Sequence, residues 1–201
     1  MDYKLLRLSQ LDEDGMRRLA ALHHSVMRTL LSDLGLPVVL RYYQVARKDP
    51  LVIGLCAVSP SGEILGWALG SPHPERINSR LRTPFTWFLF QMLRLGFTRP
   101  LVLGQLFSSV LRSSTHQDIE PEAIELTYIG VALDQRGKGW GKELLNAFIV
   151  ASRLNGYRLV IMSVEIENTS AVALYEKAGF KIIETFWEGS YQRHRMELVL
   201  A

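Results

Sequence analysis

The chain has 201 residues, 48% of them hydrophobic and 21% charged, which is ordinary for a globular domain with a buried core. The formal net charge of +3 is too small to indicate a nucleic-acid-binding protein. Cys56 is the only cysteine, so the composition excludes an intramolecular disulfide and a metal site built on paired cysteines.

We expect no signal peptide from the sequence. Its start lacks the basic segment followed by a long apolar run that is typical of a signal peptide. Arginine or glycine interrupts the longest apolar stretches before they could span a bilayer. We therefore expect a cytoplasmic, reducing location and no transmembrane segment.

The first part of the chain predicts two helices and a hairpin. Apolar residues recur at three- and four-residue spacing over residues 11–31, which indicates a helix, and a shorter helix follows over 38–46. Apolar runs over 51–58 and 64–69 read as strands, and Ser59-Pro60-Ser61-Gly62 supplies the turn between them.

The segment from Ser71 to Pro121 differs from its surroundings. It carries two helix-like apolar stretches, 85–95 and 101–111. We interpret it as a helical insertion, at about 72–120, in a single domain that covers residues 1–201.

This insertion is basic and rich in aromatic residues. Glu75 is the only acidic residue between Ser71 and Gln117, whereas that stretch contains six arginines, namely Arg76, Arg80, Arg82, Arg94, Arg99 and Arg112. One interpretation is a lid that binds a phosphorylated acceptor such as a nucleotide-sugar, or an anionic membrane surface. The other is a helical pair that packs its aromatic side chains on the domain or on a second subunit of a homo-oligomer. The sequence leaves both open.

Strands and helices alternate in the last part of the chain. The pattern predicts strands over 124–131, 159–164, 180–186 and 191–200, and helices over 141–154 and 169–178. In the first of these strands, strict alternation would place Glu125, Thr127, Ile129 and Val131 on one face. The fold class is α/β, with helices flanking a mixed sheet.

A glycine-rich turn separates the strand over 124–131 from the helix that follows it. Its sequence is Arg136-Gly137-Lys138-Gly139-Trp140-Gly141-Lys142. Glycines allow a sharp turn that brings backbone N–H groups close to a ligand, and a helix N-terminus suits a pyrophosphate. Two nucleotide motifs do not fit: a P-loop requires Ser or Thr where Glu143 stands, and a Rossmann turn requires glycine where Lys142 stands. A purely structural strand-to-helix turn is the alternative.

The stretch from Glu125 to Phe180 resembles the acetyl-CoA-binding half of the GNAT superfamily of N-acetyltransferases. The turn fits the family pattern Arg-x-x-Gly-x-Gly through Arg136, Gly139 and Gly141, and the block from Asn168 to Phe180 resembles the second hallmark. The resemblance implies a mixed, mostly antiparallel twisted sheet whose strands splay apart beside the turn, with acetyl-CoA in the splay. The residues that it implies for cofactor contact are Ile129, Val131, Arg136, Gly137, Lys138, Gly139, Trp140, Gly141, Lys142, Asn168 and Tyr175.

Two residues are candidates for the chemistry of acyl transfer to an amine. Glu125 lies six residues before Val131, an offset that matches the catalytic glutamate of family members that use one, so it is the candidate base. An exposed strand glutamate is the alternative, and Asp118, Glu120, Glu122 or a water chain could serve instead. Tyr175 lies where the family often places a tyrosine beside the thioester sulfur, so it is the candidate acid. A tyrosine that only packs against the sheet is the alternative.

Other polar residues have simpler explanations. Asn168 contacts the cofactor or only caps the helix that begins at Thr169. His23 and His24 are adjacent on a helix and cannot face the same way, so at most one lines a site, and we favour a structural role for both. No group of residues has metal-ligand spacing, so we expect no metal.

The sequence therefore predicts an acetyl-CoA-dependent N-acetyltransferase that acts on a primary amine by direct attack in a ternary complex. A small acceptor such as an amino sugar is favoured. Acetylation of a protein N-terminus or lysine is the first alternative. The second is a non-catalytic acyl-CoA-binding module, which the same fold can support.

Overall fold

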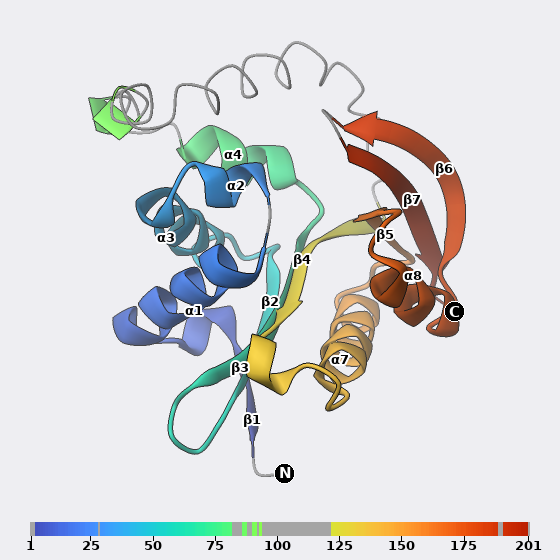
Figure 1. Cartoon of the computed structure of the whole chain (residues 1–201), viewed down its shortest axis with the longest axis horizontal. Coiled ribbons are helices and arrows are strands. Elements are labelled where there is room, and N and C mark those ends of the chain that lie inside the picture. The colour runs from blue at the N-terminus through green and yellow to red at the C-terminus, as the bar shows by residue number, and fades with distance from the viewer. Residues whose placement is uncertain are drawn as a thin grey trace.

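The computed structural model describes residues 3–27, 29–81, 86–87, 90–91, 93, 122–188 and 191–200. Within them, a seven-stranded sheet has the order β1-β2-β3-β4-β5-β7-β6 (Figure 1). The strands are β1 (Lys4–Arg7), β2 (Ile53–Val58), β3 (Ile64–Ser71), β4 (Ala123–Val131), β5 (Leu159–Glu165), β6 (Lys181–Glu188) and β7 (Tyr191–Val199). The β4–β5 pair is parallel and the other described pairs are antiparallel, so the prediction of a mixed, mostly antiparallel sheet is confirmed.

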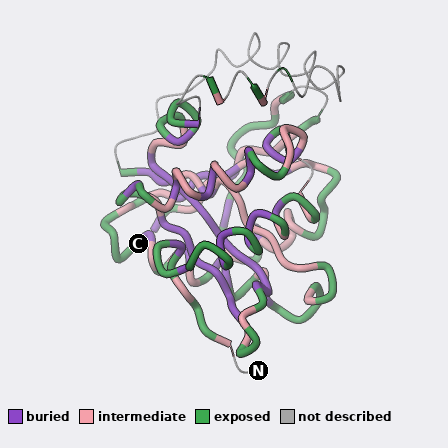
Figure 2. Tube along the Cα trace, turned by 90° about the vertical axis from the view of Figure 1, so that its left-hand side faces the viewer, coloured by how far each residue is buried: buried purple, intermediate pink, exposed green. Residues whose placement is uncertain are grey.

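Helices cover both faces of this sheet. They are α1 (Glu13–Val26), α2 (Leu30–Asp33), α3 (Leu36–Ala46), α4 (Pro74–Leu81), α7 (Trp140–Leu154) and α8 (Thr169–Lys177), with short 3-10 turns at Leu8–Gln10 and Leu133–Gln135. One core joins α1, α3 and α4 to the sheet, and a second core joins α7 and α8 to the opposite face. β2 and β3 are buried along their whole length between the two cores (Figure 2).

Side-chain caps fix where α1 and α2 begin. At the start of α1 the Asp12 carboxylate accepts a hydrogen bond from the Gly15 N–H at 2.6 Å. The sequence predicts one continuous helix over 11–31, but α1 ends at Val26 and α2 begins at Leu30. The break arises because the Thr29 side chain caps a new helix by accepting from the Ser32 N–H at 3.3 Å.

Two elements escape the sequence analysis. β1 adds an antiparallel edge strand to β2. α4 lies at the start of the predicted insertion, and its Ile77 and Leu81 are buried in the core that contains α3. The first ten residues of that insertion therefore belong to the packed domain. Most of the remainder, with Arg82, Arg94, Arg99 and Arg112, lies outside the described residues, and the insertion stays a prediction there.

A β-bulge in β4 changes which side chains share a face. Leu69 of β3 opposes Tyr128, but the next residue, Gly70, opposes Leu126, so Thr127 has no partner. Residues opposite each other in an antiparallel pair point to the same face. The expectation that Glu125 shares a face with Ile129 and Val131 is therefore wrong, because the bulge breaks the alternation. Glu125 and Tyr128 point to the α1–α3 face, and Ile129 and Val131 pack with the α7 core.

Among the described residues, no helix combines the length and apolar character that crossing a bilayer requires.

Candidate functional site

β4 and β5 separate after a short parallel ladder. Their pairing covers only Ala123–Glu125 against Leu159–Ile161, although β4 continues to Val131 and β5 to Glu165. This is the splay that the sequence resemblance implies. The Ala132 N–H points to β3, because it donates to the Leu65 carbonyl at 2.9 Å. By the alternation of an antiparallel ladder, the backbone groups of Ile129 and Val131 point to the opposite edge, which β5 has left. That open edge fits the predicted pairing with a pantetheine arm.

The glycine turn follows directly after this edge. Gly137 and Gly139 have φ of 75° and 89°, in the left-handed region that favours glycine. A Cβ at either position would meet no atom within 4 Å, so both glycines border open space. α7 begins at Trp140, and the N–H groups of its first turn have no partner within the helix.

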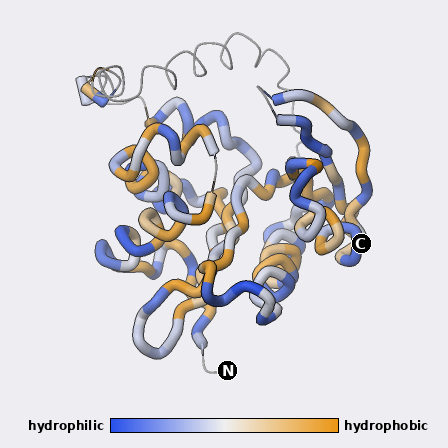
Figure 3. The backbone as a smooth tube through the Cα atoms, in the orientation of Figure 1, coloured by the Kyte–Doolittle hydropathy of each residue, from blue (hydrophilic) through white to orange (hydrophobic). Residues whose placement is uncertain are grey.

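The charged side chains of the turn remain at the surface. Arg136, Lys138 and Lys142 are exposed, and the segment that leads into α7 is hydrophilic (Figure 3). The Lys138 ammonium donates to the Gln135 side chain at 3.1 Å. Positive charge, free N–H groups and the positive end of the helix dipole therefore coincide, and these residues fit a pyrophosphate.

An open pocket of about 540 Å³ lies against this turn. Its lining residues are Tyr3, Lys138, Gly139, Trp140, Lys142, Glu143 and Asn146. The structure thus brings together four of the predicted cofactor residues. The Tyr3 hydroxyl donates to the Glu143 carboxylate at 2.9 Å, and this hydrogen bond raises the pKa of Tyr3.

The Trp140 side chain belongs mainly to the core. It is 6% exposed, and its ring meets that of Tyr3 edge to face with the centroids 4.7 Å apart. Any cofactor contact by Trp140 would therefore come chiefly from its backbone N–H at the start of α7.

Two further predicted residues lie at the N-cap of α8 and within it. The Asn168 side chain accepts from the Ala171 N–H at 3.3 Å, so it caps the helix, and its contact with the cofactor stays a prediction. Tyr175 is 4% exposed and lies edge to face with Phe180. Burial raises the pKa of Tyr175 to about 12, so the phenol is protonated at neutral pH and can donate a hydrogen bond.

The face of β4 that carries Glu125 is lined by buried aromatic residues. The rings of Tyr42 from α3 and Tyr128 from β4 meet edge to face with the centroids 5.5 Å apart. Burial raises the pKa of both phenols well above its usual range, and the Glu125 carboxylate raises it further. Glu125 therefore acts electrostatically on two buried hydroxyl groups.

Charged residues on the far side of the splay also reach Tyr128. Arg193 on β7 bridges Glu165 of β5 at 3.4 Å and Glu188 of β6 at 3.0 Å. Among the weaker influences on the pKa of Tyr128, Glu188 raises it and Arg193 lowers it. The charges of Glu125 and of this ion-pair network thus both act on the Tyr128 hydroxyl.

The two histidines of α1 face opposite ways, as expected. His24 is exposed, whereas His23 is fully buried with its Nδ1 atom 2.8 Å from the Tyr43 hydroxyl. Burial lowers the pKa of His23 to about 4, so its ring is neutral at pH 7. A hydrogen-bonded, neutral His23 agrees with the structural role that we favour.

Two further charged residues named in the sequence analysis form ion pairs. Arg80 on α4 pairs with the buried Asp49 carboxylate at 3.2 Å, which fastens α4 to the end of α3. Glu122, one of the alternative bases, pairs with Arg158 at 3.3 Å at the start of β4. Asp118 and Glu120 lie outside the described residues.

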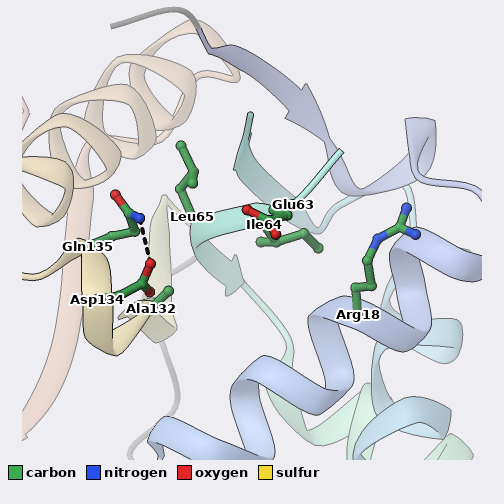
Figure 4. A pocket seen from close by; sticks show the side chains of 7 residues that line it. All are labelled: Arg18, Glu63, Ile64, Leu65, Ala132, Asp134 and Gln135. Atoms are coloured by element: carbon green, nitrogen blue, oxygen red, sulfur yellow. Dashed lines mark hydrogen bonds between the residues drawn. The ribbon is translucent and has the colours of Figure 1, made fainter. Parts of the chain in front are cut away.

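A second pocket, of about 260 Å³, lies beside the start of β3 (Figure 4). It is lined by Arg18, Glu63, Ile64, Leu65, Ala132, Asp134 and Gln135. None of the predicted site residues contributes to it. Within the part of the chain that the structure describes, no three His, Cys, Asp or Glu side chains gather as a metal site.

Sequence reasoning missed Tyr42, Tyr128 and Arg193. The first lies on a helix far from the glycine turn in sequence, and its ring meets that of Tyr128 only through the core that α3 shares with the sheet. Strict alternation would place Tyr128 on the face opposite Glu125, and a single-residue bulge leaves no mark in the sequence. Arg193 lies in a polar strand without a local motif.

We expect Tyr175→Phe to lower the rate of acetyl transfer more than it weakens acetyl-CoA binding. The ring would still pack against Phe180, but the hydroxyl donor to the departing sulfur would be lost. Stopped-flow measurement of the first turnover separates chemistry from product release. Equal single-turnover rates in the two proteins would leave Tyr175 as a packing residue.

Comparison with known proteins supports the resemblance to the GNAT superfamily. The model of the acetyltransferase (GNAT) family matches residues 19–180. A mycothiol acetyltransferase from Corynebacterium glutamicum is 42% identical over 65 residues, covering 32% of this chain and 22% of that protein. One from Geodermatophilus obscurus is 33% identical over 114 residues, covering 54% of this chain and 36% of that protein. The chain thus spans between about a fifth and about a third of the length of these two curated relatives.

Solved structures agree on the fold. The ribosomal-protein-S18-alanine N-acetyltransferase from Escherichia coli superposes with a TM-score of 0.63 at 13% identity, covering 100% of this chain and 95% of that chain. The Salmonella typhimurium protein yncA, assigned as an acetyltransferase and solved with its cofactor acetyl-CoA, gives 0.63 at 14% identity with the same coverage. The predicted fold class is confirmed.

Proposed function

Because the chain belongs to the GNAT acetyltransferase family, we propose that it transfers an acetyl group from acetyl-CoA to a primary amine by direct attack in a ternary complex. The observation that carries this proposal is the separation of β4 from β5 directly before the glycine turn. It leaves β4 with a free backbone edge and places the N-terminus of α7 shortly after the end of β4. A pantetheine arm would lie along the edge, and the pyrophosphate would lie at the helix N-terminus.

On the donor side, each group has a distinct task. The backbone of Ile129 and Val131 would pair with the pantetheine, and the N–H groups after Gly139 would bind the pyrophosphate, with the nearby cations adding attraction. A backbone N–H on the same edge would polarise the thioester carbonyl. Tyr175, protonated at neutral pH, would donate to the sulfur as the C–S bond breaks.

On the acceptor side, Glu125 would accept the proton that the amine loses. The carboxylate points to the α1–α3 face, where Tyr42 is 2% exposed. A floor of tightly packed aromatic rings suits a small amine such as an amino sugar better than a long peptide groove. Acetylation of a protein N-terminus or lysine is the second candidate, and a non-catalytic acyl-CoA-binding module is the third.

The test is a screen of small amines, amino sugars and peptides with release of free CoA as the readout. Turnover with a small amine, absent with peptides and reduced in Glu125→Gln, would support the proposal. Turnover with peptides alone would favour the second candidate. Tight acetyl-CoA binding without turnover on any acceptor would favour the third.

We expect acetyl-CoA to raise the melting temperature, because a ligand that binds only the folded state stabilises it. At a concentration 100 times its Kd the gain in unfolding free energy is about 2.7 kcal/mol. Differential scanning fluorimetry measures the shift. ADP at the same concentration is the control, because it lacks the pantetheine that the β4 edge would bind. An equal shift with ADP would contradict the role of that edge.

A further inference from the structure

The hydroxyl group of Tyr42 is buried without a regular hydrogen bond. Tyr42 lies on α3 and is 2% exposed, and apart from an interaction with the Thr127 side chain its hydroxyl has no hydrogen-bond partner within the described part of the chain. Most buried polar groups in proteins are hydrogen-bonded, and an exception indicates a ligand, a water or a functional role.

The surroundings of this hydroxyl are polar and belong to β4. Besides burial, the groups that raise the pKa of Tyr42 are Tyr128 and Glu125, whereas a hydrogen-bonding interaction with the Thr127 side chain lowers it. Thr127 is the unpaired residue of the β-bulge, and its hydroxyl also lies 3.4 Å from the carbonyl of Glu125. The bulge thus turns Glu125 toward the face on which Tyr42 lies.

The neighbouring tyrosine provides a built-in comparison. Tyr43 is fully buried as well, but its hydroxyl is satisfied by the Nδ1 atom of His23 at 2.8 Å. Of two adjacent buried tyrosines on one helix, one therefore has its hydroxyl satisfied by His23, and the other packs its ring against Tyr128, on the face of β4 that carries Glu125.

We propose that Tyr42 is an acceptor-binding residue whose hydroxyl oxygen takes a hydrogen bond from the amine and so presents that amine to Glu125. This inference rests on the proposed function. The protonated amine gives one proton to the Glu125 carboxylate and keeps a second N–H on Tyr42. Its lone pair then forms the N–C bond to the acetyl carbon as the C–S bond breaks, and the sulfur leaves as the thiol with the proton from Tyr175. The nitrogen gives its second proton to the Tyr175 phenolate by way of solvent and becomes a neutral amide, and Glu125 releases its proton to solvent.

The experiment compares Tyr42→Phe with the matched control Tyr43→Phe, using an amine that the parent acetylates. We expect Tyr42→Phe to lower kcat/KM for the amine about 10- to 100-fold, the range expected for one hydrogen bond to a charged group, with the KM for acetyl-CoA unchanged. Its melting temperature should change less than that of Tyr43→Phe, because the only described partner of the Tyr42 hydroxyl is the Thr127 side chain. Tyr43→Phe should show the reverse, a lower melting temperature and a nearly unchanged kcat/KM.

A double variant tests whether Tyr42 acts with Glu125. If the two groups hold the same amine, Tyr42→Phe added to Glu125→Gln should cost less than it costs in the parent background. A parent-like kcat/KM in Tyr42→Phe, or full additivity in the double variant, would overturn the inference while leaving the proposed function intact. A parent that acetylates no amine would refute the proposed function, and the inference would fall with it.

Discussion

Replacing Glu125 with glutamine is expected to lower the rate of acetyl transfer about 10²- to 10⁴-fold, the contribution typical of a positioned general base. The substitution keeps the shape of the side chain and removes its basicity. Because Glu125 points to the α1–α3 face and Ile129 and Val131 pack on the other, the affinity for acetyl-CoA should stay unchanged. Rates measured across the pH range, together with calorimetric affinities, check both parts.

The matched control for this change is Glu122→Gln. Glu122 lies three residues earlier in the chain, is exposed and pairs with Arg158 at 3.3 Å, so it should lose little activity. An unchanged rate for Glu125→Gln at every pH would remove Glu125 from the mechanism. The base would then be water or one of the acidic residues Asp118 and Glu120.

The second large effect is expected for Gly139→Trp, which should abolish measurable acetyl-CoA binding. Gly139 has φ of 89° and precedes the first residue of α7, so a side chain there would occupy the space in front of the helix N-terminus. The positive φ adds a strain of about 1–2 kcal/mol for any residue with a Cβ. Isothermal titration calorimetry measures the loss.

Gly62→Trp separates the effect of backbone strain on stability from the obstruction of acetyl-CoA binding. Gly62 has φ of 83° in the β2–β3 turn, and a Cβ there would also meet no atom within 4 Å. This variant should lose a similar amount of stability and bind acetyl-CoA like the parent. If Gly139→Trp bound as tightly as Gly62→Trp, the assignment of the pyrophosphate to the turn would be wrong.

The proposed acetyl-CoA-binding half of the site could be predicted from the sequence because its signals are local. The glycines of the turn, the apolar periodicity of α7 and the capping Asn168 lie within a few residues of the structures they form. These elements were predicted to within one or two residues of their observed bounds. The kink between α1 and α2 was missed even so, because a continuous apolar pattern outweighed the cap at Thr29.

The acceptor half could not be read in the same way, because it depends on contacts between distant segments. The bulge at Thr127 exists only through the register of β4 on β3. Tyr42 meets Tyr128 only because α3 packs against the sheet, and Arg193 acts on Tyr128 only because β7 lies next to β5. No spacing along one segment encodes such distances.

The bulge in β4 has a consequence for how this protein can diversify. A strand without it would put Glu125 on the same face as Ile129, and substitutions made for one substrate would disturb the other. Here the proposed amine contacts come from α3 and one face of the strand, and the proposed cofactor contacts come from its edge, α7 and α8. Mutation of the helices before β2 can therefore retune acceptor preference while the acetyl-CoA machinery is inherited unchanged.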